Sequence, residues 1–208
     1  MRRGMIGRTQ QQMYPRARLD ALTDGLFAVA MTLLVLDLRL PDDFQPHDAS
    51  ELIQGLIALT PKFLPYALSF GVLGLRWLSG IQVRSPDENL GSEYVHWWLL
   101  YLLFTTCFPF VTIVVGRFPN LAPAIWLYAG NTLILSAIGL RLLALIPDVE
   151  PGKQRDHQFL LAVLIVSSGL AIGWSFIGPR HALWPYVMGF CVVVIANRLR
   201  ERRLKRAS

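Results

Sequence analysis

The stretch that decides the fold is "RLDALTDGLFAVAMTLLVLDL", Arg18 to Leu38, in which a polar start leads into an almost wholly apolar run. Four of its first seven residues are polar or charged, and the run then stays apolar until Asp37. A run of this length has the hydrophobicity of a membrane span, where charge is costly. The polar residues at its start are therefore predicted to be functional or paired: Arg18, Asp20, Thr23 and Asp24.

The composition of the chain is that of an integral membrane protein. Hydrophobic residues make up 53% of the 208 positions, charged residues make up only 16%, and the mean hydropathy is +0.42. This balance lies outside the usual range for soluble domains. The two cysteines, Cys107 and Cys191, lie inside apolar runs without CxxC or metal-ligand spacing, so they are expected to pack as small hydrophobes.

Six apolar stretches are long enough to cross a bilayer as helices of about 20 residues. The sequence thus predicts an all-α membrane protein with a tail at 1–18, a six-helix domain at 19–197 and a basic tail at 198–208. Prolines at 61, 65 and 109 are expected to kink helices without ending them, and "GPRH", Gly178 to His181, predicts a tight hairpin. The predicted spans are Leu19 to Leu40, Leu52 to Gly80, Val95 to Arg117, Ala122 to Ile146, Phe159 to Gly178 and His181 to Asn197.

Basic residues predict the orientation, because loops rich in Lys and Arg stay in the cytoplasm. Six spans put both tails on one side, and both tails are basic, so both termini are predicted to be cytoplasmic in the plasma membrane. The tail "NRLRERRLKRAS" is also compatible with nucleic-acid or anionic-lipid binding, but a positive-inside anchor is favoured and no nucleic-acid partner is expected. The residues concerned are Arg2, Arg3, Arg8, Arg16, Arg18, Arg84, Lys153, Arg155, Arg198, Arg200, Arg202, Arg203, Lys205 and Arg206.

Motifs for catalysis or cofactor binding are missing from the sequence. It contains no GxSxG, HExxH or GxxxxGK pattern, and its four histidines never fall at metal-ligand spacing. We therefore expect neither an enzyme nor a cofactor or metal site. The loop after the first span is acidic, and Asp42 and Asp43 are suited to raising the local cation concentration at a pore mouth, although an ordinary solvated loop fits them as well.

The first span separates its polar and aliphatic residues onto different faces. At about 100° per residue, one narrow face is aliphatic with a single hydroxyl and comprises Val29, Thr32, Leu33 and Leu36. Such a stripe is by itself more typical of helix packing than of a pore. Asp20 and Asp24 lie on the opposite side, where a carboxylate needs partners. The candidates for Asp24 on other helices are Arg76, Trp77, His96, Trp97 and Asn131.

The same stretch resembles the RxxxFSDG signature and following helix of the transmembrane-protein-175 family of potassium-permeable channels. Arg18, Thr23, Asp24 and Gly25 fall at signature positions, with Leu22 for the usual Phe and Thr23 for the usual Ser. Further similar segments lie in the next three predicted helices. They are "FLPYALSFGVLGLRW" (Phe63 to Trp77), "FPFVT" (Phe108 to Thr112) and "YAGN" (Tyr128 to Asn131).

The resemblance implies a homotetramer whose pore is lined by the first helix of each chain, with potassium as the permeant ion. It places the family's hydrophobic constriction on Val29, Leu33 and Leu36. No TVGYG-like filter exists here, so passage requires partial dehydration and is expected to favour K⁺ over Na⁺ modestly. The chain departs from the family in "WLSGIQ", Trp77 to Gln82, where members often carry histidines. Val29 is likewise not a common family choice.

Two rival functions follow from the residues. A proton-coupled or other small secondary transporter would use Asp24 as its intramembrane ionisable centre, and it would show saturable, coupled flux. A non-conducting membrane scaffold has no positive feature in the sequence. A leak-type channel predicts ohmic single-channel steps instead.

Overall fold

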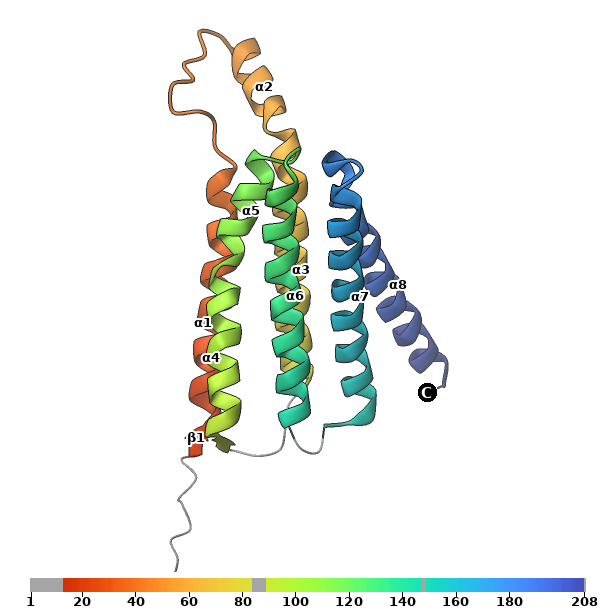
Figure 1. The fold of residues 1–208 in the computed structure, drawn as a ribbon. Coiled ribbons are helices and arrows are strands. Elements are labelled where there is room, and N and C mark those ends of the chain that lie inside the picture. Colours follow the sequence, from red (N-terminus) through yellow and green to blue (C-terminus); the bar gives the residue numbers. More distant parts are fainter. Residues whose placement is uncertain (1–12, 84–88, 147–148, 208) are drawn as a thin grey trace, which may run out of the picture.

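The structure is a computed structural model that describes residues 13–83, 89–146 and 149–207. Long helices lie side by side in one bundle (Figure 1). Within the described residues, five helices are long and apolar enough to cross a membrane, and a bent pair makes a sixth. The helices are α1 Arg16–Leu33, α2 Ala49–Ala58, α3 Thr60–Gln82, α4 Ser92–Thr106, α5 Phe108–Arg117, α6 Ala122–Leu145, α7 Pro151–Ser175 and α8 Trp184–Ala207.

One end of the bundle, which we call the base, is where α1, α4 and α7 begin and where α3 and α6 end (Figure 1). The carboxy-terminal end of α8 lies on this same side (Figure 1). A short antiparallel pair of strands, β1 Met13–Pro15 and β2 Asn89–Gly91, joins the segment before α1 to the segment before α4. This pairing was not predicted, because each strand has only three residues and little strand signal in the sequence.

Helix α1 buries only one side. Its buried residues are Leu19, Phe27 and Ala30, and the helix continues into a 3₁₀ turn, Leu34–Asp37, whose Leu34 is 1% exposed. The buried residues recur at the spacing of one helix face, against α3 and α4. Most of the remaining α1 residues are exposed on a single chain. The helix ends at Asp37, three residues before the predicted end at Leu40.

The second predicted span is not one helix. It is broken at Leu59 into α2 and α3, which meet at an angle of 47°. Pro61 occupies the first turn of α3, where a missing N–H is tolerated, and its ring favours a break at this point. Pro65 lies inside α3 without ending it. The prediction of a single helix from Leu52 was therefore wrong, whereas Pro65 behaves as expected.

The third span is also interrupted, at Cys107 between α4 and α5, with Pro109 in the first turn of α5. The fifth predicted span corresponds to α7, which begins at Pro151 rather than at the predicted Phe159. Polar residues fill its first two turns, and they carry no apolar signal in the sequence. The predicted hairpin is a 3₁₀ turn, Pro179–His181, so the last helix begins at Trp184 and not at His181.

The core lies around α6, which packs against α4, α5 and α7. Its Tyr128 is 1% exposed and stacks edge-on against Phe108 and Tyr186. Buried hydroxyls satisfy one another here, because Ser69 donates to Tyr128 and Ser168 bonds to Tyr186. This polar pairing inside an apolar bundle fixes the positions of α3, α6, α7 and α8.

The predicted division into tails and a central domain stays a prediction. Helix α8 continues to Ala207, so the basic segment from Arg198 extends the last helix. Several basic residues used to predict the orientation lie outside the described residues, namely Arg2, Arg3, Arg8 and Arg84.

Candidate functional site

The aliphatic stripe of the first helix lies exposed on the single chain. Val29 is 53% exposed, Leu33 is 41% exposed and Leu36 is 61% exposed. All three lie on the side of α1 that faces away from the rest of the bundle. An apolar row of this kind needs lipid, another copy of the chain, or a narrow pore to cover it.

The 3₁₀ turn at the end of α1 brings Leu36 into line with Leu33. Side chains three residues apart eclipse each other in a 3₁₀ helix, whereas they are offset by about 60° in an α-helix. The turn covers Leu34–Asp37, so Leu36 lies over Leu33. Two successive apolar layers therefore occupy the same side of this helix.

Thr32 is the one hydroxyl residue on this face, and its hydroxyl hydrogen is donated to the backbone of its own helix. Its Oγ1 donates to the carbonyl oxygens of Ala28 and Val29, each at 2.9 Å. A hydroxyl that donates to its own helix keeps its oxygen lone pairs free to accept a donor or a cation. Thr32 is exposed, so these lone pairs face away from the bundle.

Small residues form a second row on the exposed part of α1. They recur at intervals of three or four residues, and a side chain added at Gly25 would meet no heavy atom within 4 Å. Rows of small residues let membrane helices approach closely. The exposed small residues are Ala17, Ala21, Gly25, Ala28 and Thr32.

Thr23 is fixed by a hydrogen bond from α4. The indole Nε1 of Trp98 donates to Thr23 Oγ1 at 2.9 Å, and the Thr23 hydroxyl donates to the Leu19 carbonyl at 2.8 Å. Trp98 is 7% exposed. The sequence did not predict this partner, because Trp98 is one of three neighbouring aromatic residues and the apolar pattern does not say which one faces α1.

Asp24 is held by α3 in a similar way. The indole Nε1 of Trp77 donates to Asp24 Oδ1 at 2.8 Å. Of the predicted candidates, Trp77 is thus the one that contacts Asp24. The others bond elsewhere: Arg76 to Thr132 and Ser136, His96 to the Ser92 carbonyl, and Asn131 to the Phe104 carbonyl.

Two signature residues, Thr23 and Asp24, therefore each accept an indole N–H from a different neighbouring helix. Arg18 behaves differently, since it is exposed and makes no hydrogen bond or ion pair with any other described residue of the chain. The prediction that Arg18 is functional or paired stays a prediction. His96 and Asn131 serve α4 and the contact between α4 and α6, rather than α1 directly.

Asp37 anchors the far end of the first helix, and the sequence reasoning missed it. It is 7% exposed, and its Oδ1 lies 3.2 Å from Arg117 Nε on α5. Lys62 on α3 also donates to its backbone carbonyl, at 3.4 Å. The signal was the single carboxylate that ends the apolar run of α1. The pattern did not identify which basic residue would face it.

The acidic loop after α1 divides into capping residues and exposed carboxylates. Asp48 caps α2 by accepting the backbone N–H of Glu51 at 2.8 Å, and Glu51 accepts the N–H of His47, the residue before the cap, at 2.7 Å. Asp42 lies 3.5 Å from Arg39 in an exposed pair. Asp43 is exposed. Their predicted role at a pore mouth stays a prediction.

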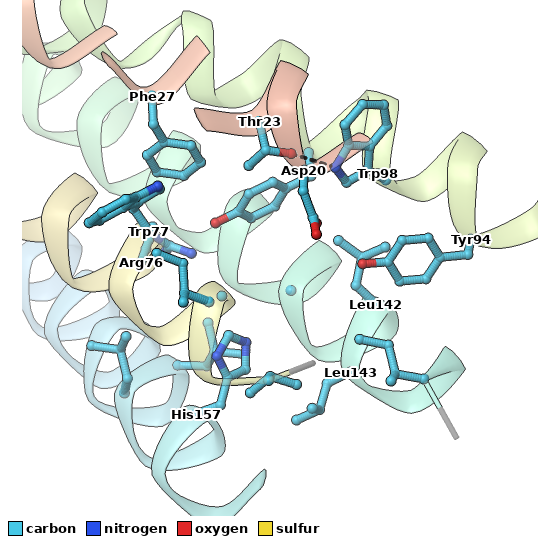
Figure 2. A pocket seen from close by; sticks show the side chains of 18 of the residues that line it. Asp20, Thr23, Phe27, Arg76, Trp77, Tyr94, Trp98, Leu142, Leu143 and His157 are labelled. Carbon is cyan, nitrogen blue, oxygen red and sulfur yellow. Dashed lines mark hydrogen bonds between the residues drawn. The ribbon is translucent and has the colours of Figure 1, made fainter. Parts of the chain in front are cut away.

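A cavity of about 110 Å³ lies at the base between α1, α3, α4, α6 and α7. Figure 2 shows Asp20 and Thr23 from α1 on one side of it, with Arg76 and His157 opposite. The Asp20 carboxylate lies 3.6 Å from Arg16 Nε one turn earlier. His157 Nδ1 makes a short hydrogen bond with Ser79 Oγ. The base of α1 thus has a dense polar environment, unlike its exposed stripe.

Comparison with known proteins identifies relatives of this chain. The family model described as "Endosomal/lysosomal potassium channel TMEM175" matches residues 18–109. A potassium channel of Streptomyces collinus is 26% identical over 208 residues, covering 89% of this chain and 97% of its own length. A potassium channel of Chamaesiphon minutus is 30% identical over 131 residues, and the match spans 63% of that protein, less than two thirds of its length.

An animal relative and a solved structure add to this comparison. The human endosomal/lysosomal proton channel TMEM175 is 36% identical over 85 residues, which is 36% of this chain and 17% of the human protein. The crystal structure of a lysosomal potassium-selective channel TMEM175 homolog from Chamaesiphon minutus matches with a TM-score of 0.67 and 25% identity. That match covers 88% of this chain and 96% of the solved one.

Proposed function

The chain belongs to the TMEM175 family, which is a family of ion channels and not an enzyme class, and on this premise we propose that it is a potassium-permeable channel. In this proposal the channel is a leak-type homotetramer in which four copies of α1 surround the conduction pathway. The family relatives described as potassium channels support the ion. No cofactor takes part, and the partners are other copies of the chain, the lipid bilayer and monovalent cations.

The observation that carries the proposal is the incomplete burial of α1. Only 22% of its most apolar stretch is buried, compared with 56% for α6. One helix cannot enclose a pore, but cyclic copies of one exposed stripe can. The row of small residues beside the stripe would allow neighbouring α1 helices to pack closely, with the larger Val29, Leu33 and Leu36 directed to the axis.

The proposed constriction selects ions by the cost of removing water. An aliphatic ring offers no oxygen ligand, so an ion that passes it must lose part of its hydration shell. Na⁺ holds its water more strongly than K⁺, and therefore pays a larger cost. The alignment of Leu36 over Leu33 lengthens the apolar constriction. A narrower ring of the same residues would stop conduction by dewetting.

Polar groups on either side of the ring would assist the ion. The Thr32 hydroxyl donates to its own helix, which leaves its lone pairs available to a partly dehydrated cation. Asp42 and Asp43 would gather cations at the outer mouth. The signature residues Thr23 and Asp24, with their partners Trp98 and Trp77, would hold α1 in register. This arrangement has both termini in the cytoplasm and the protein in the plasma membrane.

Reversal potentials in planar bilayers test the function. The purified full-length protein should give ohmic single-channel steps, and under bi-ionic conditions the reversal potential should show modest preference for K⁺ over Na⁺. Saturable flux coupled to protons would instead support a transporter centred on Asp24. Absence of cation current from well-folded tetramer would overturn the channel proposal.

A further inference from the structure

Arg76 is a buried cation whose hydrogen-bonding capacity is only partly used. It is 2% exposed, and its Nη2 donates to the Thr132 carbonyl at 3.1 Å and to Ser136 Oγ at 2.7 Å. Its Nε and Nη1 atoms are buried and have no hydrogen-bond partner in the described part of the chain. A guanidinium has five N–H hydrogens, so three of them remain without an acceptor.

The two carboxylates that line the same cavity as this guanidinium are engaged elsewhere. Asp20 and Asp24 line the same cavity as Arg76, but no ion pair joins either of them to it. Asp20 pairs with Arg16, and Asp24 accepts the indole N–H of Trp77. Burial of a charge is costly unless a counter-charge or hydrogen bonds offset it. The charge of Arg76 is therefore not neutralised by the described residues.

The cavity beside Arg76 has the size and the donors for an anion. Its volume is about 110 Å³, whereas about 10–15 Å³ on the same measure is enough to hold one water molecule. The other polar groups around it include the Tyr94 hydroxyl, which lacks a hydrogen-bond partner among the described residues and lies on the opposite side from Arg76 (Figure 2). Each of the two carboxylates in the lining has one oxygen engaged, by Arg16 or by Trp77, whereas three N–H hydrogens of Arg76 have no acceptor.

We propose that this cavity binds a small anion through the Nε and Nη1 groups of Arg76. The site lies at the base, away from the exposed stripe of α1, and it is distinct from the cation pathway. The bound anion would supply the missing acceptor and counter-charge, and it would tie α3 to the surrounding α1, α4, α6 and α7. Chloride and inorganic phosphate have this chemistry, as does the phosphate of a lipid headgroup.

The first test is a thermal titration of the purified full-length protein in detergent. Potassium gluconate is replaced stepwise by potassium chloride or potassium phosphate, so that the K⁺ concentration stays constant. Ligand binding to the folded state predicts a rise in melting temperature that continues with the logarithm of the anion concentration above Kd and reaches about 5–10 °C at a hundredfold excess over Kd. The Arg76→Met variant should lose this response. Arg141→Met, which removes an exposed arginine paired with Glu93, should keep it.

A second measurement decides the question if Arg76→Met does not fold. Wild-type crystals grown in potassium bromide should show an anomalous peak in contact with Nε or Nη1 of Arg76. A melting temperature that rises with the logarithm of the anion concentration, together with this peak, supports the proposal. Absence of the peak, or a melting temperature that responds only to added anionic lipid and to none of the free anions, would show that the cavity is not a site for a free small anion.

Discussion

Removal of the Thr23 hydroxyl tests how the first helix is anchored at its base. Valine has nearly the shape of threonine but has no oxygen, so Thr23→Val leaves the indole N–H of Trp98 without its acceptor. Trp98 is 7% exposed, and the bond it loses is 2.9 Å long. Water therefore has little access to replace the lost oxygen, and the full cost of an unsatisfied buried donor should appear.

The expected cost is about 2 kcal/mol, since a buried donor left without a partner costs about 1–3 kcal/mol. Loss of the second bond, from Thr23 to the Leu19 carbonyl, adds little because such back-bonds compete with the helix itself. For a chain of this size the melting temperature falls by about 2–4 °C per kcal/mol. Thr23→Val should thus melt about 4–8 °C below the wild type.

A double-mutant cycle isolates this bond from other effects. Phenylalanine at position 98 has no N–H, so Thr23→Val should cost much less in the Trp98→Phe background. Thr23→Ser keeps the acceptor oxygen and should remain within about 0.5 kcal/mol of the wild type. Melting of the purified protein in detergent measures all four variants. An equal loss from Thr23→Val in both backgrounds would refute the proposed hydrogen-bond anchor.

Three further results are expected. Leu33→Trp should block K⁺ current while the protein still assembles. Leu33→Asn should lower the K⁺/Na⁺ permeability ratio, because it adds a polar ligand to the ring. Unchanged current in the first variant and an unchanged ratio in the second would show that Leu33 does not line the pathway. Asp37→Asn should reduce the free energy of unfolding by about 1–2 kcal/mol, because it leaves the half-exposed Arg117 without its counter-charge. The same substitution should cost less in an Arg117→Met background. The double variant Asp42→Asn, Asp43→Asn should have a lower single-channel conductance than the wild type at 20 mM KCl but not at 1 M KCl, where the screening length is only about 3 Å. An equal ratio of variant to wild-type conductance at both salt concentrations would contradict a role in gathering cations.

The membrane-spanning segments were predictable because each depends on a local property of the chain. About 20 apolar residues predict a span, and Pro61 marked the region where the second span breaks. The start of α7 at Pro151 was not predictable in the same way, since a helix can extend past the apolar residues into polar ones. The strand pair also depends on contacts between distant segments and has no local signal.

The candidate site was only partly predictable for the same reason. Periodicity placed Val29, Leu33 and Leu36 on one face of a helix, and the structure finds all three exposed. It did not predict the 3₁₀ turn that brings Leu36 over Leu33. Nor could a single sequence identify Trp98 as the partner of Thr23 or Arg117 as the partner of Asp37. Such pairs are set by which helices lie side by side, and that is decided by the packing of the whole bundle.

Silver accessibility of cysteines in α1 tests the central claim most directly, because Ag⁺ is a monovalent cation close to K⁺ in size and binds thiolates. The native cysteines are first replaced by alanine, since Cys191 is exposed and Cys107 is partly so. Cysteines are then placed singly at Leu33 and Leu36, with a control at Val166, which is 59% exposed on α7. If four copies of α1 surround the ion pathway, Ag⁺ should block current irreversibly in the two α1 variants and spare Val166→Cys. Undiminished current in both α1 variants would contradict the account.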